Sequence, residues 1–250
     1  MYSLMAKAIS HYKDKQKCRN SEFWQKTILQ TFGHCVEKIV IFEKDFYNKP
    51  FFRMTEKEKM LRQMLYDANN DKDLIEERKV AKDLCYDFNH LRPSDVAGQQ
   101  RIMRRLLGKT AGDSFCIVAP FWCDYGYNIE IGENFFANHN TVILDGAKVK
   151  FGNNVFIAPN CGFHTAGHPI DAERRNQGLE YAYPITVGDN VWIGAGVQVM
   201  PGVTIGSNVV IGGGSVVVRD IPSNVVAVGN PCRVMRSITD EERLKSWDRE

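Results

Sequence analysis

Long apolar runs are absent from this sequence. No stretch approaches the roughly 20 consecutive apolar residues that a helix needs to span a bilayer. The opening residues, MYSLMAKAISHYKDKQKC, also lack the apolar core of a secretion signal. We therefore expect a cytoplasmic protein that has no membrane partner.

Paired cysteine spacings are absent too. The seven cysteines include no Cys-x-x-Cys motif, and their number is odd. Both observations argue against a disulfide framework or a thiolate zinc site, and they suit a reducing compartment. His11, Cys18, His34 and Cys35 do not follow the spacing of a known metal motif, so we expect no bound metal.

A strong charge of one sign is also missing, because the net charge is only +2. Residues 1–53 hold ten Lys/Arg and five Asp/Glu, whereas the remainder holds 22 and 25. The remainder is therefore slightly acidic, which argues against general nucleic-acid binding. Residues 1–53 carry no pattern that indicates chemistry. We interpret them as an extension of unknown role and favour a true start at Met54, where a more coherent pattern begins.

The sequence does contain a repeat with a period of six. Apolar residues recur at this spacing in two runs. The first run is Ile131, Ala137, Ile143, Val149 and, after a shift of two residues, Phe151, Ile157, Phe163. The second run is Val187, Ile193, Val199, Ile205, Ile211, Val217. This period fits neither an α-helix nor an alternating antiparallel sheet. It predicts a mainly β protein, a solenoid with three short strands in each turn of about 18 residues.

The repeat predicts how the rest of the chain is organised. We expect a helical segment at 54–112, the solenoid at 113–232 and a tail at 233–250. The first helix would place Met60, Leu61, Met64 and Leu65 on one face. A second would run through DKDLIEERKVAKDLCYDFNH, and a third would be capped at Pro93 and Ser94 and stop at Gly108. Such helices can shield the open first turn of a solenoid.

One polar stretch, FHTAGHPIDAERRNQGLEYAYP at 163–184, interrupts the repeat. The frame of six is intact on both sides of it, so we predict an extruded loop. Such a loop can carry a side chain outside the solenoid, where a substrate can reach it.

Five motifs together resemble the maltose and galactoside O-acetyltransferases, a branch of the hexapeptide-repeat acyltransferases. They are MTEKEKMLRQMLYDA, YDFNH, ANHNTVILD, the stretch from IAPNCGFHTAGHP to PGVTIG, and VVAVGNPCRVMR. The resemblance runs from about Met54 to Ile238. It implies a left-handed parallel β-helix preceded by a small α-helical segment, and a homotrimer with active sites between subunits. It also implies acetyl-CoA as donor and a sugar hydroxyl as acceptor.

The resemblance assigns three candidate catalytic residues. His168, in TAGHP, matches the family's catalytic histidine, and a neutral imidazole can remove the proton of an attacking hydroxyl. Asn138 matches an acceptor-pocket residue that could bind the sugar or stabilise an oxyanion, although it could simply turn a corner. Glu180 matches a carboxylate that could orient the imidazole or hold a sugar hydroxyl, although it could be a solvated loop charge.

Other matched positions concern the two substrates. Asp67 and Arg78 match acceptor-binding residues, with helix-surface charge as the alternative interpretation. The predicted coenzyme site combines small residues beside the pantetheine arm, an aromatic residue at the thioester and cations for the phosphates. These are Ala158, Ala195, Gly213, then Trp192, then Arg219, Arg233, Arg236.

The sequence leaves several alternatives open. Phe136, Gly146 and Val218 depart from the galactoside type, which favours a maltose or glucose acceptor. An antibiotic or serine acceptor is the alternative within the acyltransferases. A γ-type carbonic anhydrase would instead bind zinc through three histidines, for which His139, His164 and His168 are available. A non-catalytic scaffold would have no reason to extrude a base, and Cys161 falls at an inward packing position, so we expect it to be no nucleophile.

Overall fold

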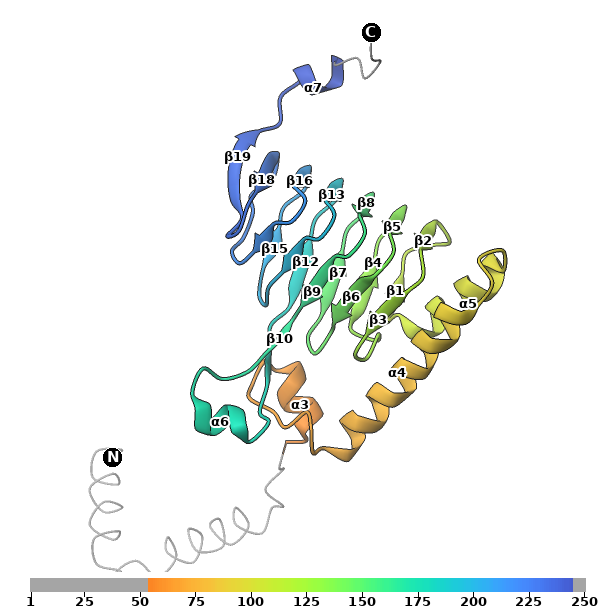
Figure 1. Ribbon diagram of the computed structural model, residues 1–250, viewed down its shortest axis with the longest axis vertical. Helices are drawn as coiled ribbons and strands as arrows, with labels where there is room; N and C mark the ends of the chain where they lie inside the picture. Colours follow the sequence, from red (N-terminus) through yellow and green to blue (C-terminus); the bar gives the residue numbers. More distant parts are fainter. Residues whose placement is uncertain (1–53, 245–250) are drawn as a thin grey trace, which may run out of the picture. The chain divides into compact units, whose positions relative to one another are not determined.

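A computed structural model describes residues 54–244 of this chain. The predicted extension at 1–53 and the last residues of the predicted tail lie outside the described residues. Within the described range, three parallel sheets wind into a β-solenoid, and helices lie beside its first turn (Figure 1). None of the described helices combines the length and apolar character that a membrane span requires.

The solenoid has about six turns, and successive turns add successive strands to each sheet. The first sheet contains β1 (Lys109–Thr110), β4 (Ile129–Ile131), β7 (Val149–Phe151), β12 (Ile185–Val187) and β15 (Thr204–Ile205). The second contains β2 (Phe115–Ile117), β5 (Phe135–Ala137), β8 (Val155–Ile157), β13 (Val191–Ile193), β16 (Val209–Ile211), β18 (Val225–Val228) and β19 (Arg233–Ser237). The third contains β3 (Phe121–Cys123), β6 (Thr141–Leu144), β9 (Gly162–His164), β14 (Gln198–Val199) and β17 (Val216–Val217).

This arrangement confirms the fold that the period of six predicted. In β7, Val149 and Phe151 point inward and are buried, while Lys150 between them is exposed. The shift of two residues also has a structural reason. Phe136 pairs with Phe156, 20 positions later, whereas Trp192 pairs with Val210, 18 positions later. The early turns are therefore two residues longer than the later ones.

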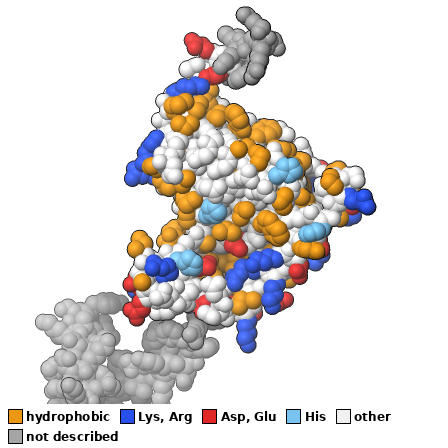
Figure 2. Space-filling model, in the orientation of Figure 1, with side chains coloured by type: hydrophobic (Ala, Val, Ile, Leu, Met, Phe, Trp, Pro, Cys, Tyr) orange, Lys and Arg blue, Asp and Glu red, His pale blue; other side chains and the backbone are white. Residues whose placement is uncertain are grey.

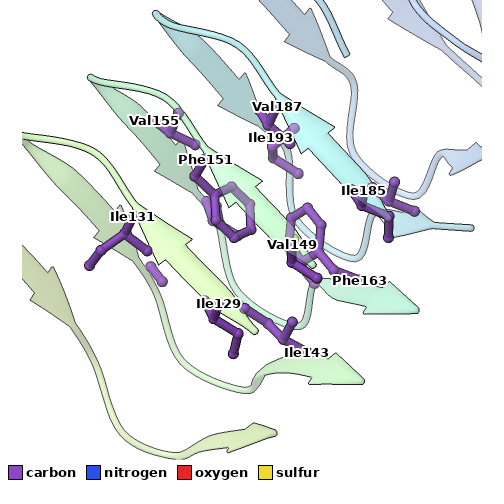
Figure 3. Close-up of a cluster of buried hydrophobic side chains, with 14 of the residues drawn as sticks. Ile129, Ile131, Ile143, Val149, Phe151, Val155, Phe163, Ile185, Val187 and Ile193 are labelled. Carbon is purple, nitrogen blue, oxygen red and sulfur yellow. The ribbon is translucent and has the colours of Figure 1, made fainter. Parts of the chain in front are cut away.

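Aromatic rings fill part of the interior of the longer, early turns. Phe151 lies between Phe135, at a ring separation of 5.1 Å, and Phe163, at 5.0 Å in an edge-on contact (Figure 3). Isoleucine and valine from neighbouring strands close the space around them. Burial of these side chains is the main favourable term that holds the coils together.

Asparagine turns one corner of the solenoid. Asn154 adopts a φ of 55° and Asn190 a φ of 58°, in the left-handed region that asparagine tolerates better than most residues. Their side chains also form a ladder, because Asn134 donates to Asn154 at 2.9 Å and Asn154 donates to Asn190 at 3.0 Å. The corner therefore contributes hydrogen bonds between turns as well as a change of direction.

The helical segment contains α3 (Glu56–Leu61), α4 (Lys72–His90) and α5 (Val96–Leu106). The predicted first helix is too long, because α3 ends at Leu61 and Gln63 has a φ of 59°. Only Met60 of its predicted apolar face is buried. The cap of α5 is Asp95, whose side chain accepts from the Gly98 amide, so the predicted cap at Pro93 and Ser94 is also wrong.

Helices α4 and α5 cover the first turn, as the sequence predicted. Their buried residues, among them Leu84, Cys85, Phe88 and Met103, share one hydrophobic core with the coils. The predicted helical segment nevertheless ends in a strand, since β1 already belongs to the solenoid. At the other end, β19 pairs antiparallel with β18, so the second sheet extends into the predicted tail, which then continues to α7 (Glu241–Leu244).

The extruded loop is shorter than the stretch that breaks the repeat. Phe163 and His164 remain in β9, so the predicted start at 163 is wrong. The chain leaves the solenoid in a two-stranded ribbon, β10 (Ala166–Gly167) with β11 (Tyr181–Ala182), and α6 (Ala172–Asn176) lies between the two strands in the sequence. Val199 pairs with Phe163, 36 positions earlier. The excursion thus lengthens one turn by as much as a whole later turn, which explains why the frame of six survives it.

Candidate active site

His168 follows directly after β10, at the outer end of the ribbon, and its side chain is exposed. Its Nδ1 lies 3.0 Å from the main-chain oxygen of Leu179, which lies just before the opposite strand, β11. A carbonyl oxygen can only accept a hydrogen bond, so Nδ1 must carry the proton in this contact. A neutral His168 therefore has its free lone pair on Nε2, which faces away from this contact and can act as a base.

Glu180 follows Leu179 and is half-buried. Its Oε2 accepts a hydrogen bond of 3.1 Å from the hydroxyl of Tyr66. The carbonyl of Leu179, rather than the carboxylate of Glu180, is thus the group that holds the His168 ring. Of the two roles that we predicted for Glu180, orientation of the imidazole is not supported by these contacts, whereas a contact with the acceptor stays a prediction.

Asn138 follows β5 at a corner of the solenoid. Its Oδ1 accepts from the amide of His139 at 2.8 Å, and its main-chain oxygen accepts from Thr141 at 2.8 Å. The residue with positive φ at this corner is Asn140, so the turn itself does not explain an asparagine at 138. Among residues 54–244, no hydrogen-bond partner engages the two N–H bonds of its side-chain amide.

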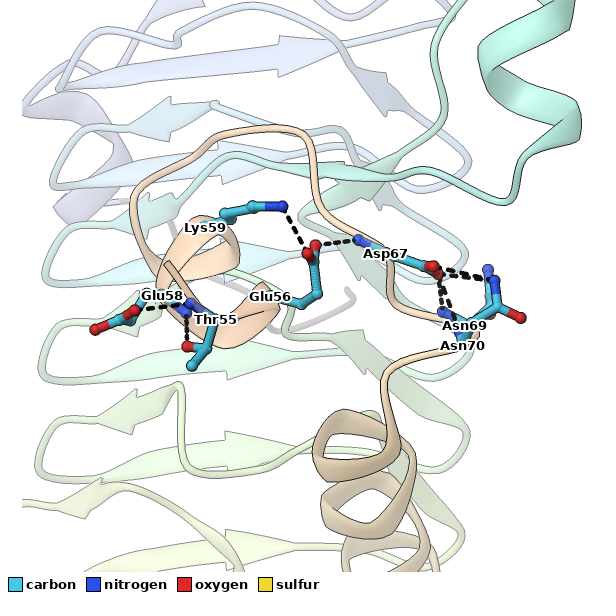
Figure 4. Close-up of polar contacts among 7 residues, drawn as sticks. All are labelled: Thr55, Glu56, Glu58, Lys59, Asp67, Asn69 and Asn70. Atoms are coloured by element: carbon cyan, nitrogen blue, oxygen red, sulfur yellow. Dashed lines mark hydrogen bonds and ion pairs between the residues drawn. The ribbon is translucent and has the colours of Figure 1, made fainter. Parts of the chain in front are cut away.

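Asp67 and Arg78 lie in the helical segment, and each is bound to groups of this chain. Asp67 accepts from the main-chain amides of Asn69 at 3.2 Å and Asn70 at 3.0 Å, which closes a turn (Figure 4). Arg78 donates to the hydroxyl of Tyr125 at 2.7 Å and to the carbonyl of Ala68 at 2.5 Å. Both side chains therefore shape the polypeptide around the site, and acceptor contact stays a prediction for them.

The small residues of the predicted coenzyme site lie at the corner that follows the second sheet. Asn138 donates its main-chain amide to Ile157 at 2.9 Å, which places it one turn away from Ala158. Ala195 and Gly213 are neighbours on later turns, because a Cβ at Gly213 would lie 3.1 Å from the Ala195 oxygen. The structure thus brings the candidate oxyanion residue and the candidate pantetheine residues to one edge of the solenoid.

The predicted phosphate cations and Trp192 are exposed. Arg219 follows β17, and Arg233 and Arg236 lie in β19. Arg236 is already paired with Glu242, at 2.7 Å. Trp192, at the outward position of β13, is 57% exposed. Other hydrophobic side chains are scattered over the solenoid face drawn in Figure 2.

The other two histidines of the zinc alternative, His139 and His164, have partners of their own. His164 contacts Oε1 of Gln198 through Nε2 at 2.8 Å, and His139 contacts the carbonyl of Ala119. Across residues 54–244, no three His, Cys, Asp or Glu side chains gather as metal ligands would. Cys161 is buried and donates to the carbonyl of Gly194 at 3.2 Å, and burial raises the pKa of its thiol. These contacts agree with a packing role for Cys161.

Comparison with known proteins places these features in a family. A profile described as the maltose acetyltransferase hexapeptide capping motif matches residues 59–112, and the bacterial transferase hexapeptide profile matches residues 184–219. A Saccharomyces cerevisiae protein named as an acetyltransferase is 60% identical over 178 residues, which are 71% of this chain and 90% of that protein.

Two solved structures agree with that assignment. A maltose O-acetyltransferase from Clostridium difficile is 51% identical, with a TM-score of 0.73, and the match covers 75% of this chain and 99% of that one. A galactoside acetyltransferase solved in complex with coenzyme A is 42% identical, with a TM-score of 0.74, and the match covers 79% and 97% of the two chains. This chain belongs to the maltose and galactoside O-acetyltransferase family.

Sequence reasoning missed two residues that shape the candidate site. Leu179 holds the His168 ring through its main chain, and Tyr66 pairs with Glu180. A main-chain contact leaves no signal in the sequence, since any residue type can make it. Tyr66 carried a weak signal, because a buried tyrosine usually needs a partner for its hydroxyl.

A buried acid lies beneath the helical side of the site. Asp145 is fully buried and accepts from the main-chain amides of Tyr125 at 2.8 Å and Asp124 at 3.1 Å. Burial raises the pKa of its carboxyl to about 7. Burial also raises the pKa of Asp124, although the nearby charge of Arg78 opposes that rise. Asp145 thereby fixes the loop from which Tyr125 reaches Arg78.

Proposed function

We propose that this protein is an acetyl-CoA-dependent O-acetyltransferase that modifies a sugar hydroxyl, with His168 as the general base. Family membership supports the acetyl transfer. The observation that carries the choice of base is the contact between Nδ1 of His168 and the Leu179 carbonyl, which leaves Nε2 free. An imidazole fixed in this tautomer can accept a proton without first rearranging.

In the proposed step, Nε2 of His168 takes the proton of the acceptor hydroxyl as its oxygen attacks the thioester carbonyl. A C–O bond forms, the C–S bond breaks, and the proton passes to the departing thiolate of coenzyme A. The free amide of Asn138 would stabilise the oxyanion formed on the carbonyl oxygen. We propose direct transfer, because the hydrogen bond that the His168 ring makes among the described residues goes to a main-chain carbonyl and not to a nucleophilic side chain. Cys161 is buried, and its thiol pKa is raised.

The coenzyme would lie along the edge that carries Ala158, Ala195 and Gly213. Coenzyme A in the related galactoside acetyltransferase supports this ligand class. The small side chains would let the pantetheine arm approach the main chain closely. Arg219 and Arg233 would bind the phosphates. Arg236 would bind a phosphate as well once its ion pair with Glu242 breaks. Trp192 would line the thioester channel.

The acceptor would bind between the ribbon and the helical segment. Glu180 has one carboxylate oxygen engaged by Tyr66 and a second one for a sugar hydroxyl. The similarity to a maltose O-acetyltransferase and the glycine at position 146 favour a maltose or glucose acceptor. Asp67 and Arg78 would act by holding the wall of this pocket, since their own polar atoms are already bound.

A homotrimer would complete the site. His168 is exposed in the single chain, whereas general bases act best when water is excluded. The outward face of the second sheet also exposes Phe156, at 43%, beside Trp192. Apolar surface of this kind is typical of a subunit contact.

The decisive experiment measures thiol release from acetyl-CoA with glucose, maltose, a galactoside, serine and an aminoglycoside. We expect glucose and maltose to be the best acceptors and His168→Ala to lower kcat by about 10²–10⁴-fold. His164→Ala is the matched control, because Nε2 of His164 is already bound to Gln198, and the variant should retain most of the activity. Unchanged turnover in His168→Ala, or one zinc ion per subunit that is lost together with His139, would refute the proposal.

A further inference from the structure

Two residues of the helical segment hold the main chain on either side of Leu179. Tyr66 and Glu180 exchange two main-chain hydrogen bonds, each of 3.0 Å, across 114 residues of sequence. Asn69 donates its side-chain amide to the carbonyl of Gly178 at 3.0 Å. The residue between these two attachment points is the one whose carbonyl receives the Nδ1 proton of His168.

The Asn69 attachment depends on a turn that Asp67 builds. The carboxylate of Asp67 accepts from the main-chain amides of Asn69 and Asn70 and from the side-chain amide of Asn70 (Figure 4). Asn69 therefore keeps its side chain free to reach Gly178, while Asn70 turns its side chain back to Asp67. The glycine at 178 adopts a φ of 78°, a conformation that few other residues would tolerate there.

The Tyr66 attachment is reinforced by a buried side chain. Tyr66 is 1% exposed, and its hydroxyl donates to Oε2 of Glu180 at 3.1 Å. Burial, with the nearby charge of Glu180, raises the pKa of this hydroxyl, so that it remains a donor at any working pH. The hydroxyl also lies at the base of the ribbon, because a Cβ at Gly146 would be 2.9 Å from it and 3.2 Å from Ala182.

We propose that Tyr66 and Asn69 are positioning residues that clamp residues 178–180, so that the Leu179 carbonyl holds His168 in its base-competent tautomer and orientation. This Tyr66–Asn69 clamp rests on the proposed role of His168 as the base. It gives the helical segment a part in catalysis as well as in covering the first turn. The clamp acts from outside the reacting atoms, since neither residue contacts the imidazole itself.

The test compares Asn69→Ala with Asn70→Ala, its neighbour in the same turn. Asn69→Ala removes the bond to Gly178, whereas Asn70→Ala removes the two side-chain bonds to Asp67 and keeps the main-chain ones. Loss of one hydrogen bond should lower kcat about three- to tenfold in Asn69→Ala, with the KM for acetyl-CoA unchanged. Asn70→Ala should keep the wild-type kcat.

Tyr66→Phe tests the other arm of the clamp. It removes the hydroxyl but preserves the ring and the two main-chain bonds, so the variant should fold. We expect a similar decrease of kcat and, because Glu180 loses its partner, a changed KM for the sugar. Thermal unfolding of each variant would show whether the loss of turnover merely follows a loss of stability.

A spectroscopic measurement tests the clamp independently of turnover. In ¹⁵N-histidine-labelled protein, the His168 signals, assigned by their loss in His168→Ala, should report the Nδ1–H tautomer. In Asn69→Ala and Tyr66→Phe they should move toward the mixture of tautomers that a free imidazole shows, and in Asn70→Ala they should not. Wild-type signals and wild-type kcat in both clamp variants would overturn the clamp. Retained turnover in His168→Ala would overturn the proposed base instead.

Discussion

The side chain of Asn89 pairs with the main chain of Phe121 as a neighbouring strand would. Its Oδ1 accepts from the Phe121 amide at 2.8 Å, and its Nδ2 donates to the Phe121 carbonyl at 3.0 Å. Phe121 begins β3, which is the edge strand of the third sheet. Helix α4 thus supplies, from one residue, the hydrogen bonds that the missing preceding turn cannot provide.

Asn89→Ala should therefore destabilise the first turn. The substitution leaves the buried main-chain N–H and C=O of Phe121 without these partners, which typically costs about 1–3 kcal/mol. Urea unfolding followed by circular dichroism would measure the change. Asp87→Ala, at an exposed position on the same helix, is the control and should change stability by less than about 0.5 kcal/mol. Equal effects of the two substitutions would contradict this role for Asn89.

Gly146 and Tyr66 should be energetically coupled. A Cβ at position 146 would lie 2.9 Å from the Tyr66 hydroxyl, which is closer than ordinary contacts allow. Gly146→Ala should cost about 1–3 kcal/mol of unfolding free energy. In the double variant with Tyr66→Phe, the missing hydroxyl leaves room, so the combined cost should be smaller than the sum of the single costs. Additive costs in a double-mutant cycle would show that the two groups do not meet.

The solenoid was predictable because its signal is local and repeated. Each lead residue of the period of six is buried for the same reason, so an irregular residue in one repeat does not hide the pattern. The end of α3 was not predictable in this way. The apolar residues beyond Leu61 continue a helical spacing, but the chain turns at Gln63 so that Tyr66 can pair with Glu180. A partner 114 residues away overrode the local preference.

The candidate site was predictable to a smaller extent. His168 stood out because it lies in the one stretch that breaks the repeat, and the structure does place it at the end of an extruded ribbon. Its hydrogen-bond partner did not stand out, since a main-chain carbonyl at Leu179 depends on register rather than on residue type. The same holds for Asp67, whose carboxylate closes a turn that the neighbouring residue types do not predict.

Substitution of a buried phenylalanine should weaken folding, whereas substitution of an exposed one should weaken assembly. Phe163 is fully buried, so Phe163→Ala should lower the unfolding free energy by about 3–5 kcal/mol. Phe156 is exposed on the face that we assign to the subunit contact. Phe156→Ala should leave the circular dichroism spectrum unchanged but shift the mass in analytical ultracentrifugation from trimer toward monomer. A monomeric wild-type protein would contradict the proposed assembly. A trimer that persists in Phe156→Ala would show that the subunit contact lies on another face.

The buried carboxyl of Asp145 should make stability depend on pH. Its pKa is about 7 in the folded chain because burial disfavours the charged form, whereas an unfolded aspartate titrates near 3.8. Between these values the folded state binds a proton that the unfolded state has released, so this contribution to stability decreases as pH rises from about 4 to about 7. Asp145→Asn keeps an acceptor for the Tyr125 and Asp124 amides but cannot ionise. The difference in unfolding free energy between wild type and Asp145→Asn should therefore shift in favour of the variant as pH increases through this range. A difference that stays constant from pH 4 to pH 8 would mean that Asp145 titrates alike in both states.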